Sequence, residues 1–277
     1  MLPRSSLVCL LAACLLPALA AAAPKPLWEL GLGVGAISFP DYPGSDQQHS
    51  YAVPVPYVVY RGKILRADRH GLQARLFGTD RVRAYLSAGA SPPVNSSDNA
   101  ARSGMPSLKP MVEFGPAFEV HLWRAPAQRM RLDLRVPVRT AFTVQNRPRQ
   151  VGWLLAPVLN LDVDDVAQAP GWNFGAQAGP LFADRKYNET LYGVAPAYAT
   201  AVRPAYAAPG GYAGSQFTLA LSKRFPRYWV GAFARYTDLH GAAFATSPLM
   251  RRDSNISCGI GIAWILGQST RMVDSHE

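Results

Sequence analysis

Charged residues and long apolar runs are both scarce in this chain of 277 residues. Only 17% of the residues are charged, where about 25% is usual for soluble proteins. After residue 23, no stretch approaches the roughly 18 apolar residues that a membrane-spanning helix needs. Hydrophobic residues make up 49% of the chain and aromatic residues recur throughout, which argues against disorder. The mature chain therefore either leaves the membrane or crosses it as strands.

Cysteine is nearly absent. Two of the three cysteines, Cys9 and Cys14, lie in the first 23 residues, which we interpret as a cleaved leader. Cys258 is the single cysteine of the remaining, mature chain. An exported protein with one mature cysteine forms no internal disulfide. Its stability must come from elsewhere, and the closed hydrogen-bond ladder of a barrel in lipid can supply it.

The sequence also lacks the common motifs of catalytic, nucleotide and metal sites. It contains no H-E-x-x-H, G-x-S-x-G, Walker A or C-x-x-C pattern. No two of the five histidines stand at metal-ligand spacing. The formal charge is +10, but no run of five basic residues occurs, which argues against nucleic-acid binding. We expect a protein without enzymatic activity, cofactor or metal.

Two groups of polar residues leave alternatives open. Asp238 and His240, two apart on a strand, would point to the same side near the rim, where a hydrolase could use them on a water molecule. We favour a polar strand end that enters a loop. Asp162, Asp164 and Asp165 resemble part of a calcium loop, but the required glycine and distal glutamate are missing. We expect these three to mark a solvated turn.

The first 23 residues have the features of a secretory signal peptide. Arg4 precedes an apolar run over 7–23, and small residues at its end predict cleavage between Ala20 and Ala23. An uncleaved membrane anchor is one alternative. Another is a lipoprotein, because residues 11–14 resemble a lipidation box that ends at Cys14. We expect residues 24–277 to form a single domain that is exported to the outer membrane of a Gram-negative bacterium.

Apolar and polar residues alternate with a period of two, which places successive side chains on opposite faces of a strand. The clearest case is 130–138, with five apolar residues on one face. The opposite, predicted lumen-facing side carries the charged residues Arg131, Asp133, Arg135 and Arg139. A barrel with lipid outside and water inside requires this pattern. Over 28–36 and 256–264 the inner positions are mostly small, which lets the wall curve.

Weaker alternating segments complete the predicted wall. They lie at 51–59, 61–67, 71–78, 82–88, 112–122, 151–162, 172–178, 217–221 and 230–236. Pro54 and Pro56 supply no ladder N–H, so the strand at 51–59 must be bulged or poorly paired. Short connections at 124–128 and 224–227 contrast with long ones at 91–110 and 184–213. The sequence predicts an all-β fold, a closed antiparallel transmembrane β-barrel of about twelve strands.

Several loop motifs resemble those of the MipA/OmpV family, the MltA-interacting proteins. The matches keep their order from residue 28 to about residue 265. They include the family's Y-x-G-S-D loop at 42–46 and a G-P-L-F-A-D stretch at 179–184 followed by Tyr187. The chain departs from the family pattern at 241–246, which has no acidic residue, and in its polar tail at 267–277. The motif positions are Tyr42, Gly44, Ser45, Asp46, Gly179, Pro180, Asp184 and Tyr187.

The resemblance implies an outer-membrane barrel that is not an enzyme. The best-known relative is described as a scaffold that joins a lytic transglycosylase, a murein hydrolase, to a bifunctional penicillin-binding protein, a murein synthase. Other relatives are described as surface adhesins or porins. The motif residues would shape loops or line a binding surface. An alternative from the residues is a small-solute channel that prefers anions, because Arg131, Arg135, Arg139 and Arg235 would face its lumen.

Overall fold

The computed structural model describes residues 24–62, 65–68, 71–79, 81–125, 129–166 and 169–273. The leader, with its predicted cleavage site and Cys14, lies outside the described residues. The main sheet consists of β2 (Trp28–Pro40), β3 (Gln48–Arg61), β4 (Leu65–Asp68), β5 (Gly71–Gly78), β6 (Val82–Ser91), β7 (Met111–Ala125), β8 (Met130–Thr143), β9 (Gln150–Leu155), β10 (Val158–Asp164), β11 (Trp172–Ala183), β12 (Gly211–Arg224), β13 (Tyr228–Asp238) and β14 (Ser254–Gln268).

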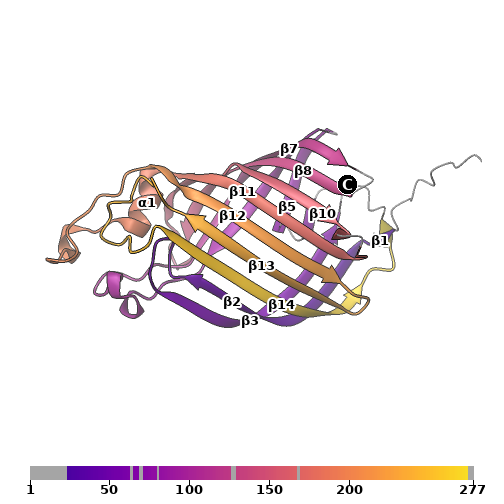
Figure 1. Cartoon of the computed structure of the whole chain (residues 1–277), viewed down its shortest axis with the longest axis horizontal. Coiled ribbons are helices and arrows are strands. Elements are labelled where there is room, and N and C mark those ends of the chain that lie inside the picture. Colours follow the sequence, from indigo (N-terminus) through magenta and orange to yellow (C-terminus); the bar gives the residue numbers. More distant parts are fainter. Residues whose placement is uncertain are drawn as a thin grey trace, which may run out of the picture.

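The strand pairings close this antiparallel sheet into a barrel (Figure 1). Apart from β9 and β10, each strand pairs with the next along the chain, and β14 returns to pair with β2. Residues 156–157 interrupt one strand path and divide it into β9 and β10. Because β8 pairs with both halves, and β11 also pairs with both, the two halves act as one strand of the wall. The 13 sheet segments therefore make twelve wall strands, which confirms the predicted fold.

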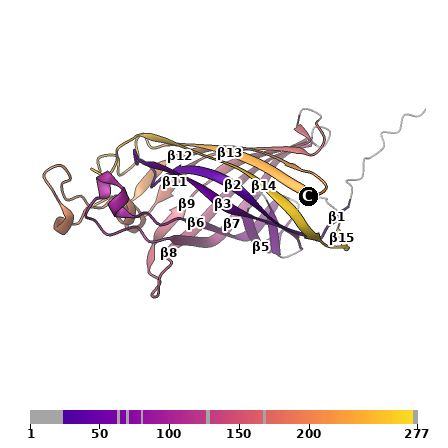
Figure 2. The same cartoon turned by 90° about the horizontal axis from the view of Figure 1, so that it is seen from below.

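The two ends of the barrel differ (Figures 1 and 2). At one end, which we call the turn end, short connections such as 225–227 lie beside a small sheet of β1 (Lys25–Pro26) and β15 (Met272–Val273). At the other, the loop end, lie the long connections 92–110, 184–210 and 239–253. Helix α1 (Arg185–Tyr192) and the 3-10 turns η1 (Ser96–Asp98), η2 (Ala100–Arg102) and η5 (Pro196–Tyr198) belong to these loops.

The barrel presents its apolar side chains outward. Leu32 on β2 is 55% exposed and Ile260 on β14 is 67% exposed, whereas Glu29 on the inner face of β2 is 1% exposed. A soluble core would bury the leucine and expose the glutamate. An apolar outer band and a polar interior are the arrangement that lipid requires. Among the described residues, no helix is long and apolar enough to cross a membrane.

The sequence predicts that strand β3 is either bulged or poorly paired because of its two prolines. It pairs with β2 from Gln48 to Tyr60 without a register shift, so it has no bulge there. On its other side, the pairs formed by the described residues join it to β4 through Tyr60 and Arg61. Proline cannot donate to a neighbouring strand and is tolerated where no neighbour requires its N–H. The two prolines face outward. On the opposite face, the buried Tyr57 donates its hydroxyl to Glu29 Oε2 inside the barrel.

Two glycines on facing strands give a matched test of the wall. A Cβ on Gly33 would lie 1.8 Å from the Ile262 carbonyl oxygen, whereas a Cβ on Gly261 would meet nothing closer than a Val55 methyl at 3.3 Å. Gly33→Ala must therefore shift the β2–β14 ladder, and we expect it to cost about 1–3 kcal/mol or more. Urea unfolding in lipid vesicles, with Gly261→Ala as control, measures the difference. Equal midpoints for the two variants would contradict the close strand approach.

Candidate functional site

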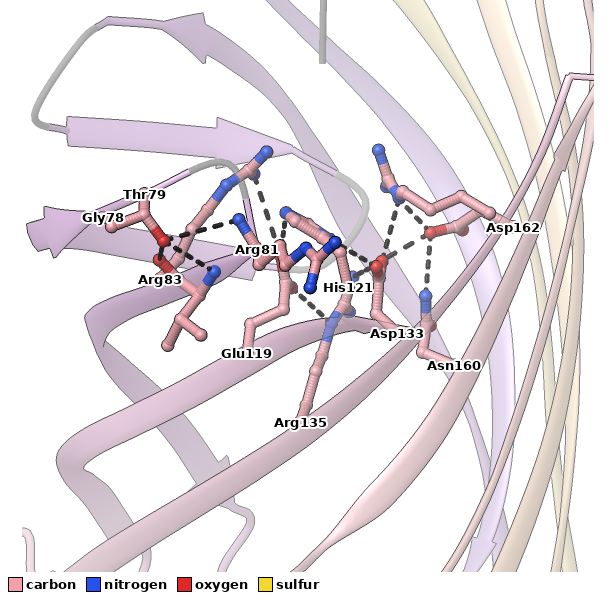
Figure 3. A network of polar contacts seen from close by, with 12 residues as sticks. Gly78, Thr79, Arg81, Arg83, Glu119, His121, Asp133, Arg135, Asn160 and Asp162 are labelled. Atoms are coloured by element: carbon pink, nitrogen blue, oxygen red, sulfur yellow. Dashed lines mark hydrogen bonds and ion pairs between the residues drawn. The ribbon is translucent and has the colours of Figure 1, made fainter. Parts of the chain in front are cut away.

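The inward positions of β7, β8 and β10 near the turn end carry an ionic network, whose contacts are drawn in Figure 3. Its centre is Asp133 on β8, which is fully buried. One carboxylate oxygen accepts from Arg131 Nε at 2.8 Å, and the other lies 2.5 Å from His121 Nδ1. Arg135 Nε donates to Glu119 Oε2 at 2.7 Å. The charged side chains on the inner faces of β7 and β8 thus form ion pairs with one another and do not line a water-filled pore.

The network continues onto neighbouring strands. Asp162 on β10 accepts from Arg131 Nη2 at 3.0 Å and from Asn160 Nδ2 at 2.8 Å. Asp162 was predicted in a solvated turn, and that prediction is wrong, because the residue is 2% exposed inside the barrel. The alternation explains the error: Asp162 is the inward neighbour of Leu161 and Val163 on β10, and pairing with β8 sets it beside Arg131.

A second ionic cluster crosses the interior at the turn end. Glu29 on β2 receives Arg224 Nε of β12 at 2.6 Å and Arg61 Nη2 of β3 at 2.9 Å. Strands β13 and β14 lie between β12 and β2 in the wall. The Glu29–Arg224 contact therefore crosses the lumen and does not join neighbouring strands of the wall. This cluster is not predicted by the sequence, because alternation shows which face of the strand a residue occupies but not which partner it meets.

Among the described residues, the network contains one set of potential metal ligands. Ligand atoms of Glu119, His121 and Asp133 lie within 4.8 Å of one another, and buried His121 Nε2 has no hydrogen-bond partner among the residues that the structure describes. However, Arg135 and Arg131 bond the same carboxylates. Their guanidinium groups offset the negative charge that would attract a cation. The arrangement fits a self-neutralised ionic network better than a metal site.

The loop end is covered by a buried cluster from three loops, which we call the loop cap: Tyr42, Tyr192, Leu239, Phe244 and Leu249. Each of these side chains is at most 2% exposed. The rings of Tyr192 and Phe244 stack with their centroids 3.6 Å apart. Tyr42 donates its hydroxyl to the Leu249 carbonyl at 2.9 Å. Burial raises the pKa of Tyr42 to about 12, so this hydroxyl stays protonated at neutral pH.

The Y-x-G-S-D motif holds the cap to the barrel wall. Gly44 has φ +91°, and a Cβ there would lie 2.4 Å from Met250 Sδ. The side-chain amide of Asn255 on β14 accepts from the Gly44 N–H at 2.5 Å and donates to the Ser45 carbonyl at 2.9 Å. Asp46 remains at the surface, 3.7 Å from Arg251. The motif is thus fixed by its backbone, and most of it faces the protein interior.

The second motif positions α1 above the lumen. Asp184 is the N-cap of the helix and accepts from the Tyr187 N–H at 2.8 Å. The buried Tyr187 donates its hydroxyl to Glu113 of β7 at 3.2 Å, and burial raises the pKa of Tyr187 well above its usual value. A Cβ on Gly179 would lie 2.0 Å from the Pro157 carbonyl oxygen, where β9 and β10 are interrupted. The β11–β12 register shifts just after Pro180.

Asp238 and His240 contact each other, but His240 lies in the turn after β13 and not on the strand, as the favoured interpretation of a polar strand end predicts. His240 Nδ1 lies 2.6 Å from Asp238 Oδ1, which also accepts the His240 backbone N–H. The hydrogen bond to Asp238 raises the pKa of His240. The imidazole is 69% exposed at the start of the 239–253 loop. This geometry is that of an Asx turn at a strand end.

A cavity of about 710 Å³ lies between the ionic network and the loop cap. Residues of the cap form its roof, and none of the residues that line it belongs to either ionic cluster. Of the four arginines predicted to line an anion-preferring lumen, Arg131 and Arg135 are in ion pairs. Only Arg139 and Arg235 reach the cavity. An open lumen lined by four free arginines is not present in the part of the chain that the structure describes.

Comparisons with known proteins show the family and distant structural similarities. No curated protein matches the chain. Among solved structures, the NanC porin is 9% identical, with a TM-score of 0.39, and the match covers 85% of this chain and 100% of that one. The outer-membrane protein OprG from Pseudomonas aeruginosa is 7% identical, with a TM-score of 0.23 and coverages of 87% and 94%. The Ralstonia pickettii toluene transporter TbuX is 11% identical, with a TM-score of 0.25 and coverages of 90% and 71%. The family model for the MltA-interacting protein MipA matches residues 32–266, and the chain therefore belongs to that family.

Proposed function

We propose that this outer-membrane β-barrel acts as a non-enzymatic docking scaffold for murein-remodelling enzymes and does not conduct solutes. The observation that carries the proposal is an interior that is obstructed on both sides of the cavity. Two ionic clusters occupy the half of the lumen nearer the turn end, and the loop cap covers the other end. A barrel with such an interior is suited to holding its turns and loops in place, which is what a docking protein requires.

The family name supports the choice of partner. Relatives are named for interaction with MltA, which the resemblance identifies as a lytic transglycosylase, and its murein substrate lies in the periplasm. Short turns of outer-membrane barrels face the periplasm, so the turn end is the side available to such an enzyme. Export with cleavage of the leader between Ala20 and Ala23 is part of this proposal, and N-terminal sequencing of the mature protein tests it.

The turn between β12 and β13 is the docking surface that we favour. Arg227 is exposed at this turn. Lys223 Nζ lies 5.4 Å from the ring centre of Trp172 and 5.0 Å from that of Phe225. Rigid aromatic rings beside cations are frequent anchors in protein interfaces. A partner with an acidic surface would complement the basic side chains.

Crosslinking in intact envelopes, followed by purification of the tagged barrel, tests the scaffold. We expect a murein lytic transglycosylase to be recovered with the wild type and at least about fivefold less of it with Arg227→Glu, since reversing one interface charge disfavours association. Arg147→Glu, an exposed site in the 144–149 loop at the opposite end, is the matched control. Recovery of no murein enzyme, or equal loss in both variants, would count against the proposal.

The channel alternative makes the opposite prediction in planar bilayers. Because the ion pairs of Asp133 and Glu29 occupy the interior, we expect the purified wild type to insert without giving discrete conductance steps. Insertion is verified separately by protease protection of the reconstituted barrel. Reproducible steps with selectivity for anions would instead favour the small-solute channel over the closed scaffold.

A further inference from the structure

The cavity beneath the loop cap contains a cation that the protein itself does not neutralise. Arg235 lies on β13 and lines the cavity. Its Nε donates to Thr218 Oγ1 at 3.1 Å. No carboxylate of the described residues lies within the 4.0 Å limit of an ion pair with it. Four other arginines of the interior differ, because Arg131, Arg135, Arg61 and Arg224 each contact a carboxylate at 3.0 Å or less.

The cavity lining carries two carboxylates, Asp41 and Glu113, and two arginines, Arg139 and Arg235, but the contacts leave Arg235 without a carboxylate beside it. Arg139 Nη1 lies 3.9 Å from Glu113 Oε2, so these two opposite charges offset each other. Asp41, at the roof, is already engaged by His49 Nδ1 at 2.7 Å and by Asn99 Nδ2 at 2.7 Å. The Arg235 side chain is exposed to the cavity, where an anion can reach it. One guanidinium without a carboxylate partner matches a ligand that carries one carboxylate.

The neighbours of Arg235 indicate what kind of anion would fit. Thr218 on β12 and Ser257 on β14 are its cross-strand partners, and both line the cavity. Gln216 and Thr237 add an amide and a hydroxyl to the same lining. Arginine binds a carboxylate with two parallel hydrogen bonds. Hydroxyl and amide groups around it can bond the hydroxyls of the same molecule.

We propose that this cavity is a binding site for a small hydroxylated monocarboxylate, with the Arg235 guanidinium as its anchor. The volume of about 710 Å³ falls within the range of small-molecule sites. Phe233 and Phe39 supply apolar surface to the lining and can contact the carbon chain of the ligand. The site is independent of the proposed docking surface, because it lies inside the barrel and Arg227 lies at the turn end.

Calorimetry with D-gluconate on the folded barrel in detergent at low salt tests the site. Sorbitol, which lacks the carboxylate, and inorganic phosphate, which carries more charge, are the comparison probes. We expect gluconate to bind the wild type and to bind Arg235→Gln at least about tenfold more weakly, since charge-assisted hydrogen bonds are the strong ones. Arg251→Gln removes a cationic side chain outside the cavity and is expected to bind gluconate like the wild type.

Two further variants keep the test decisive if Arg235→Gln does not fold. Arg235→Lys keeps the charge but loses the two-point contact, and Thr218→Val removes the neighbouring hydroxyl. Each is expected to weaken gluconate binding by about two- to tenfold. The proposal is overturned if the folded wild type does not bind gluconate, or if all Arg235 variants that fold bind it as the wild type does. Sorbitol or phosphate binding as tightly as gluconate would also overturn it.

Discussion

Asp133→Ala is expected to lower the free energy of unfolding by about 3–5 kcal/mol, the usual cost of removing one partner of a buried ion pair. The substitution leaves Arg131 Nε and His121 Nδ1 without the carboxylate that they contact at 2.8 Å and 2.5 Å. Both groups then stay buried without that acceptor, because the strands hold them in place. Urea unfolding of the barrel in lipid vesicles, followed by tryptophan fluorescence, measures the loss.

Asp46→Ala is the control for this substitution. Asp46 also faces an arginine, at 3.7 Å, but its side chain is 40% exposed at the loop end. Exposed pairs contribute about 0–1 kcal/mol and are screened by salt, whereas buried pairs are screened much less. The Asp133→Ala effect should therefore persist in high salt. An Asp133→Ala variant that unfolds at the same urea concentration as Asp46→Ala would show that the network does not stabilise the barrel.

Period-two alternation predicts the wall of this protein well. The apolar faces over 28–36, 130–138 and 256–264 lie on β2, β8 and β14, and the segment at 71–78 coincides with β5. Lipid imposes one requirement on every strand, so each strand carries the signal in its own sequence. The segment at 151–162 was predicted as a single strand, whereas the structure divides it at residues 156–157 into β9 and β10.

The interior is harder to predict because its contacts depend on register. The alternation places Glu119 on an inward face, but only the pairing of β7 with β8 brings it to Arg135. Asp162 was predicted in a turn, and the pairing of β10 with β8 brings it to Arg131. On β3, Val53, Val55 and Tyr57 face inward, although their apolar character suggests lipid. Their partners are glycines of β2, which leave room for large side chains inside the barrel.

The contacts of the loop motifs are also hard to predict, because they join residues that lie far apart in the sequence. Gly44 and Asn255 are 211 positions apart and meet in one hydrogen bond, so neither residue alone indicates the contact. The sequence predicted that the motif residues either shape loops or line a binding surface. The structure places Tyr42, Gly44 and Ser45 in contacts that support the cap and turns Tyr187 toward Glu113. We therefore propose that these residues maintain the roof of the cavity.

Phe244→Ala is expected to open that roof. Phe244 is 1% exposed and stacks on Tyr192, and truncation of a buried phenylalanine costs about 3–5 kcal/mol. Because the residue belongs to a loop, the loss should appear as local opening of the 239–253 segment before the strands unfold. Arg251 and Arg252 donate their N–H groups to the Gly44 carbonyl in the closed cap.

Trypsin cleavage at Arg251 and Arg252 is therefore the readout for Phe244→Ala. We expect cleavage of the reconstituted variant to be at least about tenfold faster than that of the wild type. Lowering the free energy of local opening by a few kcal/mol raises the population of the cleavable, open loop by that factor or more. Val202→Ala, at a residue that is 91% exposed on the neighbouring 184–210 loop, is the control and should leave the rate unchanged. Equal cleavage of Phe244→Ala and wild type would mean that the stacked rings do not hold the loop, and that the cavity roof depends on the backbone contacts of Gly44 and Ser45 alone.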